Sequence, residues 1–236
     1  MAKKITKKAK KINLSKEEKQ ELKIGEELPK EEAKESENRQ LIWFFVIVIA
    51  IFVAFLIPYF YMESQKTFRF GGADWNIEKD PYITFYHGVF PALNGANIIY
   101  NVFLRNDPRE NKVHTEGEFN IFKYGGYLSW TSDIQNCRGQ VPRAALDLVG
   151  FIRTGIGIGN ITNGAVEPEL AEELGYPYVD CFTNPNRTVI VLRMGEPSVI
   201  QSQNNPYCYV ITIKDCDDFK PIEKFIIKTI DDSTSD

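Results

Sequence analysis

Charge is missing from one long stretch of this sequence. Residues 41–62, LIWFFVIVIAIFVAFLIPYFYM, contain no Asp, Glu, Lys or Arg, and about 20 apolar residues in a helix are enough to cross the hydrocarbon core of a bilayer. A core helix of a globular protein has a polar face, whereas here apolar side chains would surround the helix, as contact with lipid requires. The absence of charge therefore predicts one membrane-spanning helix over residues 41–62.

The features of a cleaved signal are also missing. A signal peptide has a short basic region, an apolar core of about 7–15 residues and small residues at the cleavage point. Here a head of 40 residues precedes the apolar stretch, and Pro58, Tyr59 and Tyr61 stand at its end. The stretch is therefore predicted to be an uncleaved signal anchor.

Residues 1–40 contain no aromatic residue and few apolar ones. They hold 12 Lys and Arg against 9 acidic residues, and such a composition cannot bury enough apolar surface to offset the entropy of ordering. We predict a largely disordered tail, in which Ser15 and Glu18 match a helix capping box. Six lysines within the first 11 residues suit either contact with anionic lipid or a cytoplasmic charge run that orients the span.

Cysteine is absent before the apolar stretch, and all four cysteines follow it: Cys137, Cys181, Cys208 and Cys216. Disulfides persist mainly outside the cytoplasm, so this distribution predicts an extracytoplasmic body with two disulfides and a cytoplasmic N-terminus, a single-pass type II arrangement in the cell membrane. Four cysteines allow three connectivities. The sequential one, Cys137 with Cys181 and Cys208 with Cys216, is the simplest, and the other two stay open.

Patterns that bind metals and cofactors are not present. The chain has no C-x-x-C pair, which argues against a thiol oxidoreductase and a zinc site. The glycines of residues 155–159, GIGIG, lack the spacing of a nucleotide-binding loop and are expected to end a helix. Asp215, Asp217 and Asp218 lack the spacing of a calcium loop and are expected to cap a helix. No cofactor or metal is therefore predicted.

Catalytic signatures are scarce as well. The chain has two histidines, His87 and His114, and no G-x-S-x-G motif accompanies either, so no catalytic residue is predicted. Asn160 and Asn186 each begin an N-x-T sequon and are candidate glycosylation sites. After residue 40 the chain has 16 Lys and Arg against 23 acidic residues, which argues against nucleic-acid binding by the body.

The body, residues 81–231, is expected to follow a juxtamembrane segment at residues 63–80 and to precede a flexible C-terminus at residues 232–236. Runs of Tyr, Phe, Ile and Val between turn residues predict antiparallel strands, and amphipathic patterns predict two or three helices. The sequence thus predicts one α+β domain on a single transmembrane helix. Strands are expected at residues 82–90, 97–104, 118–122, 127–131, 188–194, 198–202 and 207–213, and helices at 142–154, 168–174 and 218–230.

Aromatic side chains of the body suit a sheet core with cross-strand pairs better than a recognition surface, although both uses favour the same residue types. The residues concerned are Trp75, Tyr82, Phe85, Tyr86, Tyr124, Tyr127 and Trp130.

Two stretches carry a resemblance to a known class of proteins. Residues 100–109, YNVFLRNDPR, and residues 205–230, NPYCYVITIKDCDDFKPIEKFIIKTI, resemble segments of single-span membrane proteins of small-genome archaea. The shared pattern is a short basic head, one span, an LRxDPR-like turn, paired late cysteines and a closing helix. The resemblance implies the topology and, for the sequons, an archaeal glycosylation system. No activity is assigned to that class, so it implies no function.

The resulting hypothesis is a membrane-anchored, non-enzymatic binding or structural domain outside the cytoplasm. Besides the lipid bilayer, its expected partners are a surface glycan, a protein or a subunit of a membrane complex. The alternative is a cell-surface hydrolase whose active site is not visible in the sequence. In a third hypothesis the basic N-terminal tail carries the function, and the body serves only as a scaffold.

Overall fold

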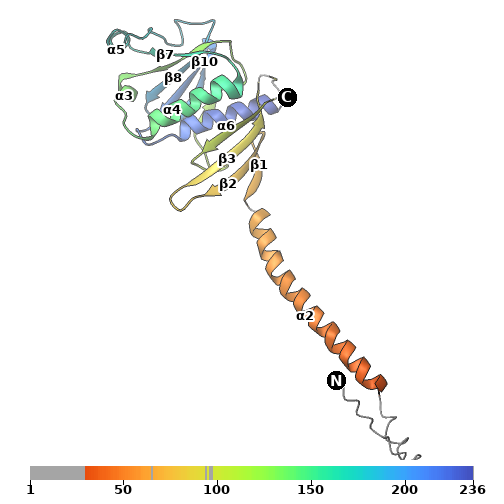
Figure 1. Ribbon diagram of the computed structural model, residues 1–236. Helices are drawn as coiled ribbons and strands as arrows, with labels where there is room; N and C mark the ends of the chain where they lie inside the picture. The colour runs from red at the N-terminus through yellow and green to blue at the C-terminus, as the bar shows by residue number, and fades with distance from the viewer. Residues whose placement is uncertain (1–29, 65, 94, 96–97, 236) are drawn as a thin grey trace, which may run out of the picture. The chain divides into compact units, whose positions relative to one another are not determined.

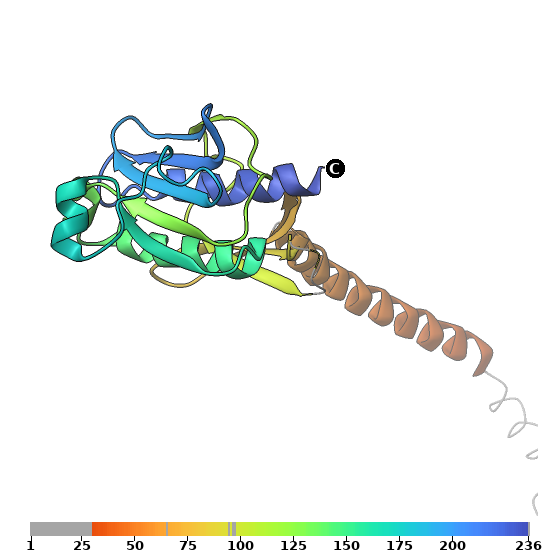
Figure 2. The same cartoon turned by 90° about the horizontal axis from the view of Figure 1, so that it is seen from above.

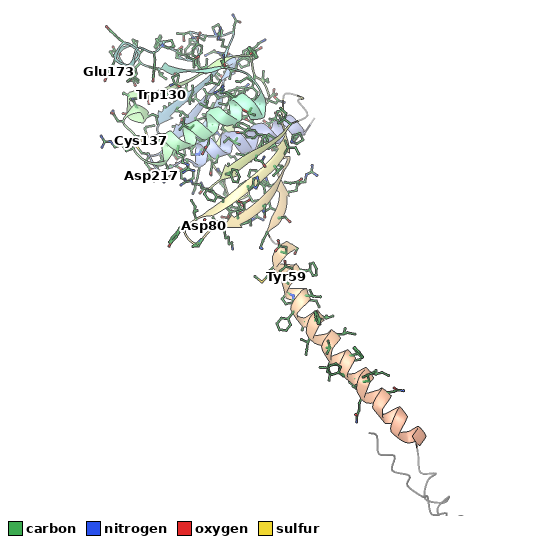
Figure 3. The ribbon with its side chains drawn as sticks, viewed as in Figure 1. Tyr59, Asp80, Trp130, Cys137, Glu173 and Asp217 are labelled. Carbon is green, nitrogen blue, oxygen red and sulfur yellow. A yellow bond between two sulfur atoms is a disulfide. The ribbon has the colours of Figure 1, made fainter. Side chains whose placement is uncertain are left out.

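The computed structural model describes residues 30–235 except residues 65, 94, 96 and 97, and the chain divides into two compact units, Met1–Tyr61 and Met62–Asp236. Helix α2 spans Lys30–Ser64. Within it, Asn38–Ser64 is the one segment of the described residues that is long and apolar enough to cross a membrane, and none of its most apolar window is buried. Side chains such as Tyr59 project from the helix on all sides (Figure 3).

The boundaries of the N-terminal prediction need correction. Residues 30–40 were expected to belong to a disordered tail, but α2 already begins at Lys30, because a long helix can continue beyond its apolar part through residues of good helix propensity such as Glu, Lys and Ala. The Ser15 capping box and the lysine-rich tip lie outside the described residues, so those predictions are not tested.

The second unit begins with a four-stranded antiparallel sheet in the order β1-β2-β3-β4. Its strands are β1 (Thr67–Phe70), β2 (Ala73–Lys79), β3 (Thr84–Pro91) and β4 (Ile99–Leu104). The first two lie in the stretch that was expected to be a juxtamembrane segment. That prediction is wrong because Ala73 and Trp75 are buried in the core, so the folded unit starts well before residue 81.

The second sheet has six strands in the order β5-β9-β10-β8-β6-β7. Only β9 and β10 pair antiparallel; the other four pairs are parallel. The predicted antiparallel arrangement is therefore right for the first sheet and wrong for the second. The strands are β5 (His114–Glu116), β6 (Gly126–Trp130), β7 (Ile161–Ala165), β8 (Thr188–Met194), β9 (Ser198–Ser202) and β10 (Asn205–Ile213).

The parallel pairing of β6 with β7 follows from a helical crossover. Between β6 and β7 the chain forms α3 (Ser132–Gln135), α4 (Gln140–Gly150) and a π-helical turn, η1 (Phe151–Ile156). Adjacent parallel strands require such a connection, whereas a hairpin joins only antiparallel strands. Gly157, at φ 80°, ends η1 in the left-handed conformation, which confirms that the GIGIG stretch terminates a helix.

The remaining helices agree with the sequence patterns. Helix α5 spans Pro168–Leu174, as predicted. Helix α6 spans Lys220–Thr234, so it includes residues that were expected to form a flexible C-terminus. Its apolar side continues to Ile230, and the Thr234 hydroxyl donates to the Ile230 carbonyl oxygen at 2.8 Å in the last turn.

The core is formed where the two sheets and two helices meet. Helices α4 and α6 lie side by side against the six-stranded sheet, and the four-stranded sheet packs against α6 (Figures 1 and 2). Trp75, Leu148, Leu192 and Phe225 represent the four contributions to one continuous apolar cluster. On its other face the six-stranded sheet packs a smaller cluster around Val179 and Val191.

One expected strand, at residues 118–122, is not formed. Phe119 is fully buried, and its ring stacks on Tyr209 and meets the edge of Phe225. Its backbone N–H donates to the Asp232 carboxylate at 3.0 Å instead of to a neighbouring strand. The apolar and aromatic composition that predicted a strand is thus used for core packing by an irregular segment.

Gly88 makes room for the largest side chain of the four-stranded sheet. Trp75 and Gly88 are cross-strand partners, and a Cβ at residue 88 would lie 2.7–2.9 Å from three carbon atoms of the indole. Such overlap cannot be relieved without moving the buried ring. We expect Gly88→Ala to lower the free energy of unfolding by about 1–3 kcal/mol in guanidinium titrations followed by tryptophan fluorescence.

The matched control is a double-mutant cycle with Trp75→Phe, whose smaller ring leaves space for the new methyl group. We expect the cost of Gly88→Ala to be clearly smaller in the Trp75→Phe background than in the wild-type background. Equal costs in both backgrounds would show that the contact with Trp75 is not the cause.

Candidate functional site

The free edge of strand β4 is the first component of the candidate site. Ala92 N–H donates to the Ile98 carbonyl oxygen at 2.9 Å, and in an antiparallel ladder hydrogen-bonded and non-hydrogen-bonded pairs alternate. From the register with β3, the N–H and C=O groups of Ile99, Asn101 and Phe103 therefore point away from the sheet. Among the described residues, none hydrogen-bonds to the backbone of Asn101 or Phe103.

Glu223 of α6 closes this edge at its C-terminal end. Its carboxylate accepts hydrogen bonds from Arg105 N–H at 2.5 Å, from Asn106 N–H at 3.3 Å and from the Asn106 side-chain amide at 2.7 Å. Arg105 follows Phe103 by two residues, so its N–H points in the same outward direction. Glu223 thus takes the position that a neighbouring strand would have at this point.

Burial dominates the electrostatics of Glu223. The residue is 5% exposed, and desolvation raises the pKa of its carboxyl group to about 7, against the opposing effect of the Arg105 and Asn106 N–H groups. A carboxyl pKa near neutrality is typical of general acids and bases. Here, however, both carboxylate oxygens are occupied by three N–H donors of one turn, which indicates a structural task.

The turn after β4 connects the four-stranded sheet to α6. Asp107 and Arg109 form an ion pair at 2.6 Å, and this hydrogen bond is the main reason why the pKa of Asp107 is lowered. The Arg109 guanidinium lies 3.8 Å from the ring centroid of Phe68 in β1. Asn111 donates to the Lys220 carbonyl oxygen at 2.8 Å. The LRNDPR stretch therefore holds the end of β4 in a fixed position.

A groove runs along the free edge and is called the β4 groove below. It has a volume of about 180 Å³, a space of about six water molecules. Strand β4 forms one wall, α4 the other, and α6 the floor. Its lining residues are Tyr100, Asn101, Val102, Phe103, Leu104 and Arg105 of β4 and the turn; Gln140, Arg143, Ala144, Leu146, Asp147 and Gly150 of α4; and Phe219, Ile222, Glu223 and Ile226.

The rim of the β4 groove is both apolar and charged. Phe103 is 52% exposed and Leu146 is 72% exposed, values that are high for large apolar side chains. Arg105 lies 5.6 Å over the Phe219 ring. Neither Arg105 nor Arg143 forms an ion pair with a described residue. Burial and the Asp147 carboxylate raise the pKa of Tyr100.

The four cysteines are all paired, but not in the sequential order. Cys137 bonds Cys216 and Cys181 bonds Cys208. The sequential prediction is wrong because β10 lies beside β8. Cys208 of β10 therefore lies next to Cys181 in the loop before β8, and Cys216, after β10, lies next to Cys137 before α4. The Val141 N–H donates to the Cys216 carbonyl oxygen at 3.1 Å, so backbone contacts also hold this junction.

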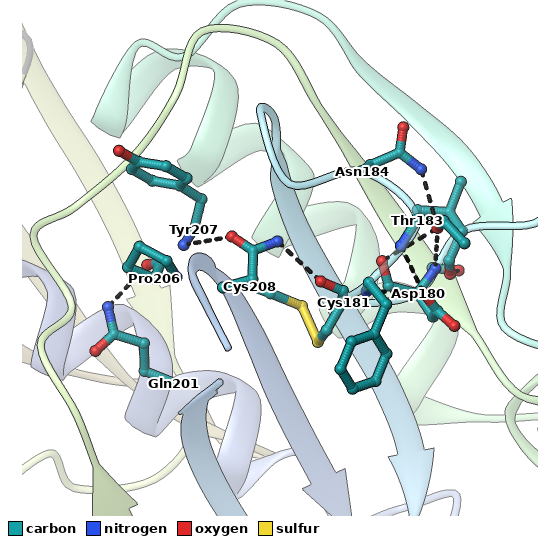
Figure 4. The surroundings of a disulfide bond; sticks show 12 residues. Asp180, Cys181, Thr183, Asn184, Gln201, Pro206, Tyr207 and Cys208 are labelled. Atoms are coloured by element: carbon teal, nitrogen blue, oxygen red, sulfur yellow. Dashed lines mark hydrogen bonds between the residues drawn. A yellow bond between two sulfur atoms is a disulfide. The ribbon is translucent and has the colours of Figure 1, made fainter. Parts of the chain in front are cut away.

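The Cys181–Cys208 bond anchors a compact turn (Figure 4). Asp180 accepts hydrogen bonds from Phe182 N–H and Thr183 N–H, both at 2.8 Å, and from the Tyr178 hydroxyl at 2.7 Å. Burial opposes ionisation of Asp180, but these hydrogen bonds together lower its pKa. Asn205 donates to the Cys181 carbonyl oxygen at 3.0 Å. The turn is fully explained by its own hydrogen bonds.

The other candidate residues from the sequence have local partners. His87 lies in β3, with its ring nitrogens 2.8 Å from Glu78 and from Asn101, and its ring stacks on Phe103. His114 is exposed in β5. The contacts of His87 are those of a structural histidine on the surface of the sheet. No group of three or more His, Cys, Asp or Glu residues that could hold a metal ion is found in the described part of the chain.

The aspartates before α6 act locally. Asp215 accepts from Asp217 N–H at 3.0 Å, and Asp218 accepts from Lys220 N–H at 3.3 Å, at the start of the helix. The predicted N-cap role is wrong in position, because Phe219 occupies the N-cap without a side-chain cap hydrogen bond, and Asp218 contacts the first helical N–H from the residue before it.

The two sequons differ in their surroundings. Asn160 and Thr162 are both exposed. Asn186 is exposed too, but Thr188 of its sequon is fully buried, and its hydroxyl donates to the Lys123 carbonyl oxygen at 3.0 Å. Only the first sequon thus has both its Asn and its Thr exposed in the folded domain, and glycosylation at either site stays a prediction.

The aromatic residues of the body divide between core and surface. Trp75 is buried, and Phe85, Tyr86, Tyr127 and Trp130 are partly buried. The two remaining residues of the predicted core set, Tyr82 and Tyr124, are 97% and 82% exposed.

The sequence analysis missed the β4 groove. Glu223 is a charged residue of an amphipathic helix, but it lies one turn before the buried Ile227 and packs inward. A signal for this groove was available in the strand of residues 99–104, which contains no charge and no proline and is followed by a turn rich in polar residues.

Comparison with protein-family models, curated proteins and solved structures gives no match, so the resemblance to archaeal single-span proteins stays a prediction.

Proposed function

We propose that this protein is a membrane-anchored, non-enzymatic domain that binds a partner outside the cytoplasm. Helix α2 would span the bilayer with the N-terminus in the cytoplasm. An apolar helix capable of spanning and two disulfides in the unit that follows it support this topology, because disulfides persist in oxidising compartments. The lysine-rich tip would then contact the anionic inner surface of the membrane.

The observation that carries the binding function is the β4 groove. Exposed apolar side chains beside unpaired backbone groups are typical of interaction sites rather than of a solvent-facing edge. The buried carboxyl group of this groove, Glu223, already accepts hydrogen bonds from Arg105 and Asn106. The geometry therefore supports recognition, and among the expected partners it favours a protein over a glycan, because a protein can pair with backbone N–H and C=O groups.

Site-specific photocrosslinking tests this function in the native membrane. A benzoylphenylalanine residue at position 103 or 146 would lie on the rim of the groove, and one at position 182, where Phe182 is 70% exposed, serves as the matched control outside it. We expect a discrete protein adduct from the two groove positions and not from position 182. The same adducts from all three positions, or none from the groove, would contradict a binding function of this site.

A further inference from the structure

We infer that strand β4 accepts an extended acidic segment of a partner protein as the fifth strand of the antiparallel sheet. This inference rests on the proposed binding function and names the chemistry of its partner. It begins from a comparison of the edge strands, because natural proteins protect such edges by short length, charge, proline or cover.

The other edges of the two sheets have more of such protection than β4 has. Strand β1 has 4 residues and carries Arg69, and β5 has 3 residues and carries Glu116. Strand β7, Ile-Thr-Asn-Gly-Ala, also lacks charge and proline, but it contains a glycine, and residues 177–179 hydrogen-bond to Ala165 at its end. Strand β4 has 6 residues, Ile-Tyr-Asn-Val-Phe-Leu, without charge or proline. Its backbone groups at Asn101 and Phe103 are left without partners in the described part of the chain.

The groove has the form that an added strand requires. Helix α4 runs beside β4 in the opposite direction. A Cβ on Gly150, at the end of α4, would lie 3.5 Å from the Tyr100 hydroxyl, whereas the start of α4 is bonded to Cys216, in the segment that leads to Phe219, and Arg105 lies over the Phe219 ring. A segment paired with β4 would therefore lie along α4 and cover Leu146. Alternate side chains of that segment would point into the cavity, since successive residues of a strand face opposite sides.

Charge complementarity indicates the acidic character. Arg105 and Arg143 stand on opposite walls of the groove, and neither has a carboxylate within ion-pair distance among the described residues. Asp147 supplies one negative charge on the same rim, and the buried Glu223 carboxyl group, which accepts from the Arg105 N–H and the Asn106 amide, lies below it. An acidic segment would pair with the two guanidinium groups. A second copy of this chain would instead bring two further arginines to the same groove.

The test uses the full-length protein in nanodiscs and fluorescent seven-residue peptides. The acidic probe is Thr-Glu-Val-Asp-Val-Glu-Thr, and the matched control has lysine at each acidic position. In fluorescence anisotropy we expect the acidic probe to bind at least about tenfold more tightly, with affinity falling as salt is raised. Arg143→Gln should weaken its binding about two- to fivefold, whereas Arg153→Gln, outside the groove, should leave it unchanged.

Two further measurements separate strand pairing from simple charge attraction. Methylation of one alternate set of peptide amides should abolish binding and methylation of the other set should preserve it, because only one edge of a strand faces β4. Phe103→Pro should also abolish binding. It leaves the ladder with β3 intact, since the Phe103 N–H points outward and proline is tolerated on such edges.

Several results would overturn the inference: equal binding of acidic and lysine peptides, equal effects of the two methylation sets, or unchanged binding by Phe103→Pro. A dimer in analytical ultracentrifugation that Phe103→Pro dissociates would identify a second copy as the occupant and would also overturn it. If the groove positions give photoadducts but no peptide binds, the strand-pairing inference is contradicted and the proposed binding function stands. If the groove positions give no photoadducts, the proposed binding function itself is contradicted.

Discussion

Replacing Cys137 and Cys216 together with alanine is expected to lower the free energy of unfolding by about 4–5 kcal/mol. The bond joins residues 79 positions apart, and the entropy that a cross-link removes from the unfolded chain grows with the length of the closed loop. The bond also joins the start of α4 to the segment before α6, the two helices of the core. The measurement is guanidinium-induced unfolding of the full-length protein in detergent, followed by tryptophan fluorescence.

The second disulfide provides the matched control. Cys181 and Cys208 are only 27 positions apart, so alanine replacement of this pair should cost about 3.5 kcal/mol, roughly 1 kcal/mol less. If the order of the two effects were reversed, the stability of the domain would depend on local packing around Cys181 rather than on loop closure.

Glu223→Gln is expected to change how stability depends on pH. Burial raises the folded-state pKa of Glu223 to about 7 from its ordinary 4.5. Below pH 4.5 the group is protonated in both states. As pH rises from 4.5 to 7, the unfolded chain loses this proton first, so the wild-type free energy of unfolding falls. The variant lacks this titration and should gain about 3 kcal/mol relative to the wild type between pH 4.5 and pH 7.5.

The comparison requires denaturant titrations of both proteins across that pH range. Glu173→Gln, which changes an exposed glutamate of α5, is the control and should follow the wild-type pH profile. A constant difference between Glu223→Gln and the wild type at every pH would mean that Glu223 ionises normally in the folded protein and that burial does not control its charge.

The elements of the body that depend on local patterns were predictable. The amphipathic spacing of Ile222, Phe225, Ile226 and Ile230 predicted α6, and Pro168 marked the start of α5 correctly. The apolar stretch at residues 41–62 predicted the helix that is capable of crossing a membrane. In each case the signal is local: an apolar period along one helix face, a proline in the first helical turn, or an uninterrupted apolar run.

The features that depend on long-range pairing were not predictable from one sequence. The crossover through α4 decides that β7 lies parallel to β6, and the parallel placement of β10 beside β8 brings Cys208 to Cys181. The β4 groove needs residues that are more than 100 positions apart, as the contact between Arg105 and Glu223 shows. Local composition carries no information about such contacts, so the fold class was predicted only in part and the groove was missed.

Labelling of single introduced cysteines in intact cells tests most directly whether the disulfide-bonded body lies outside the cytoplasm. The described chain has no free cysteine, so the background is low. Tyr82→Cys replaces a side chain that is 97% exposed, and Ala2→Cys lies in the N-terminal tail. We expect a membrane-impermeant maleimide to label Tyr82→Cys in intact cells and Ala2→Cys only after permeabilisation. The reverse pattern would contradict the proposed extracytoplasmic location of the body.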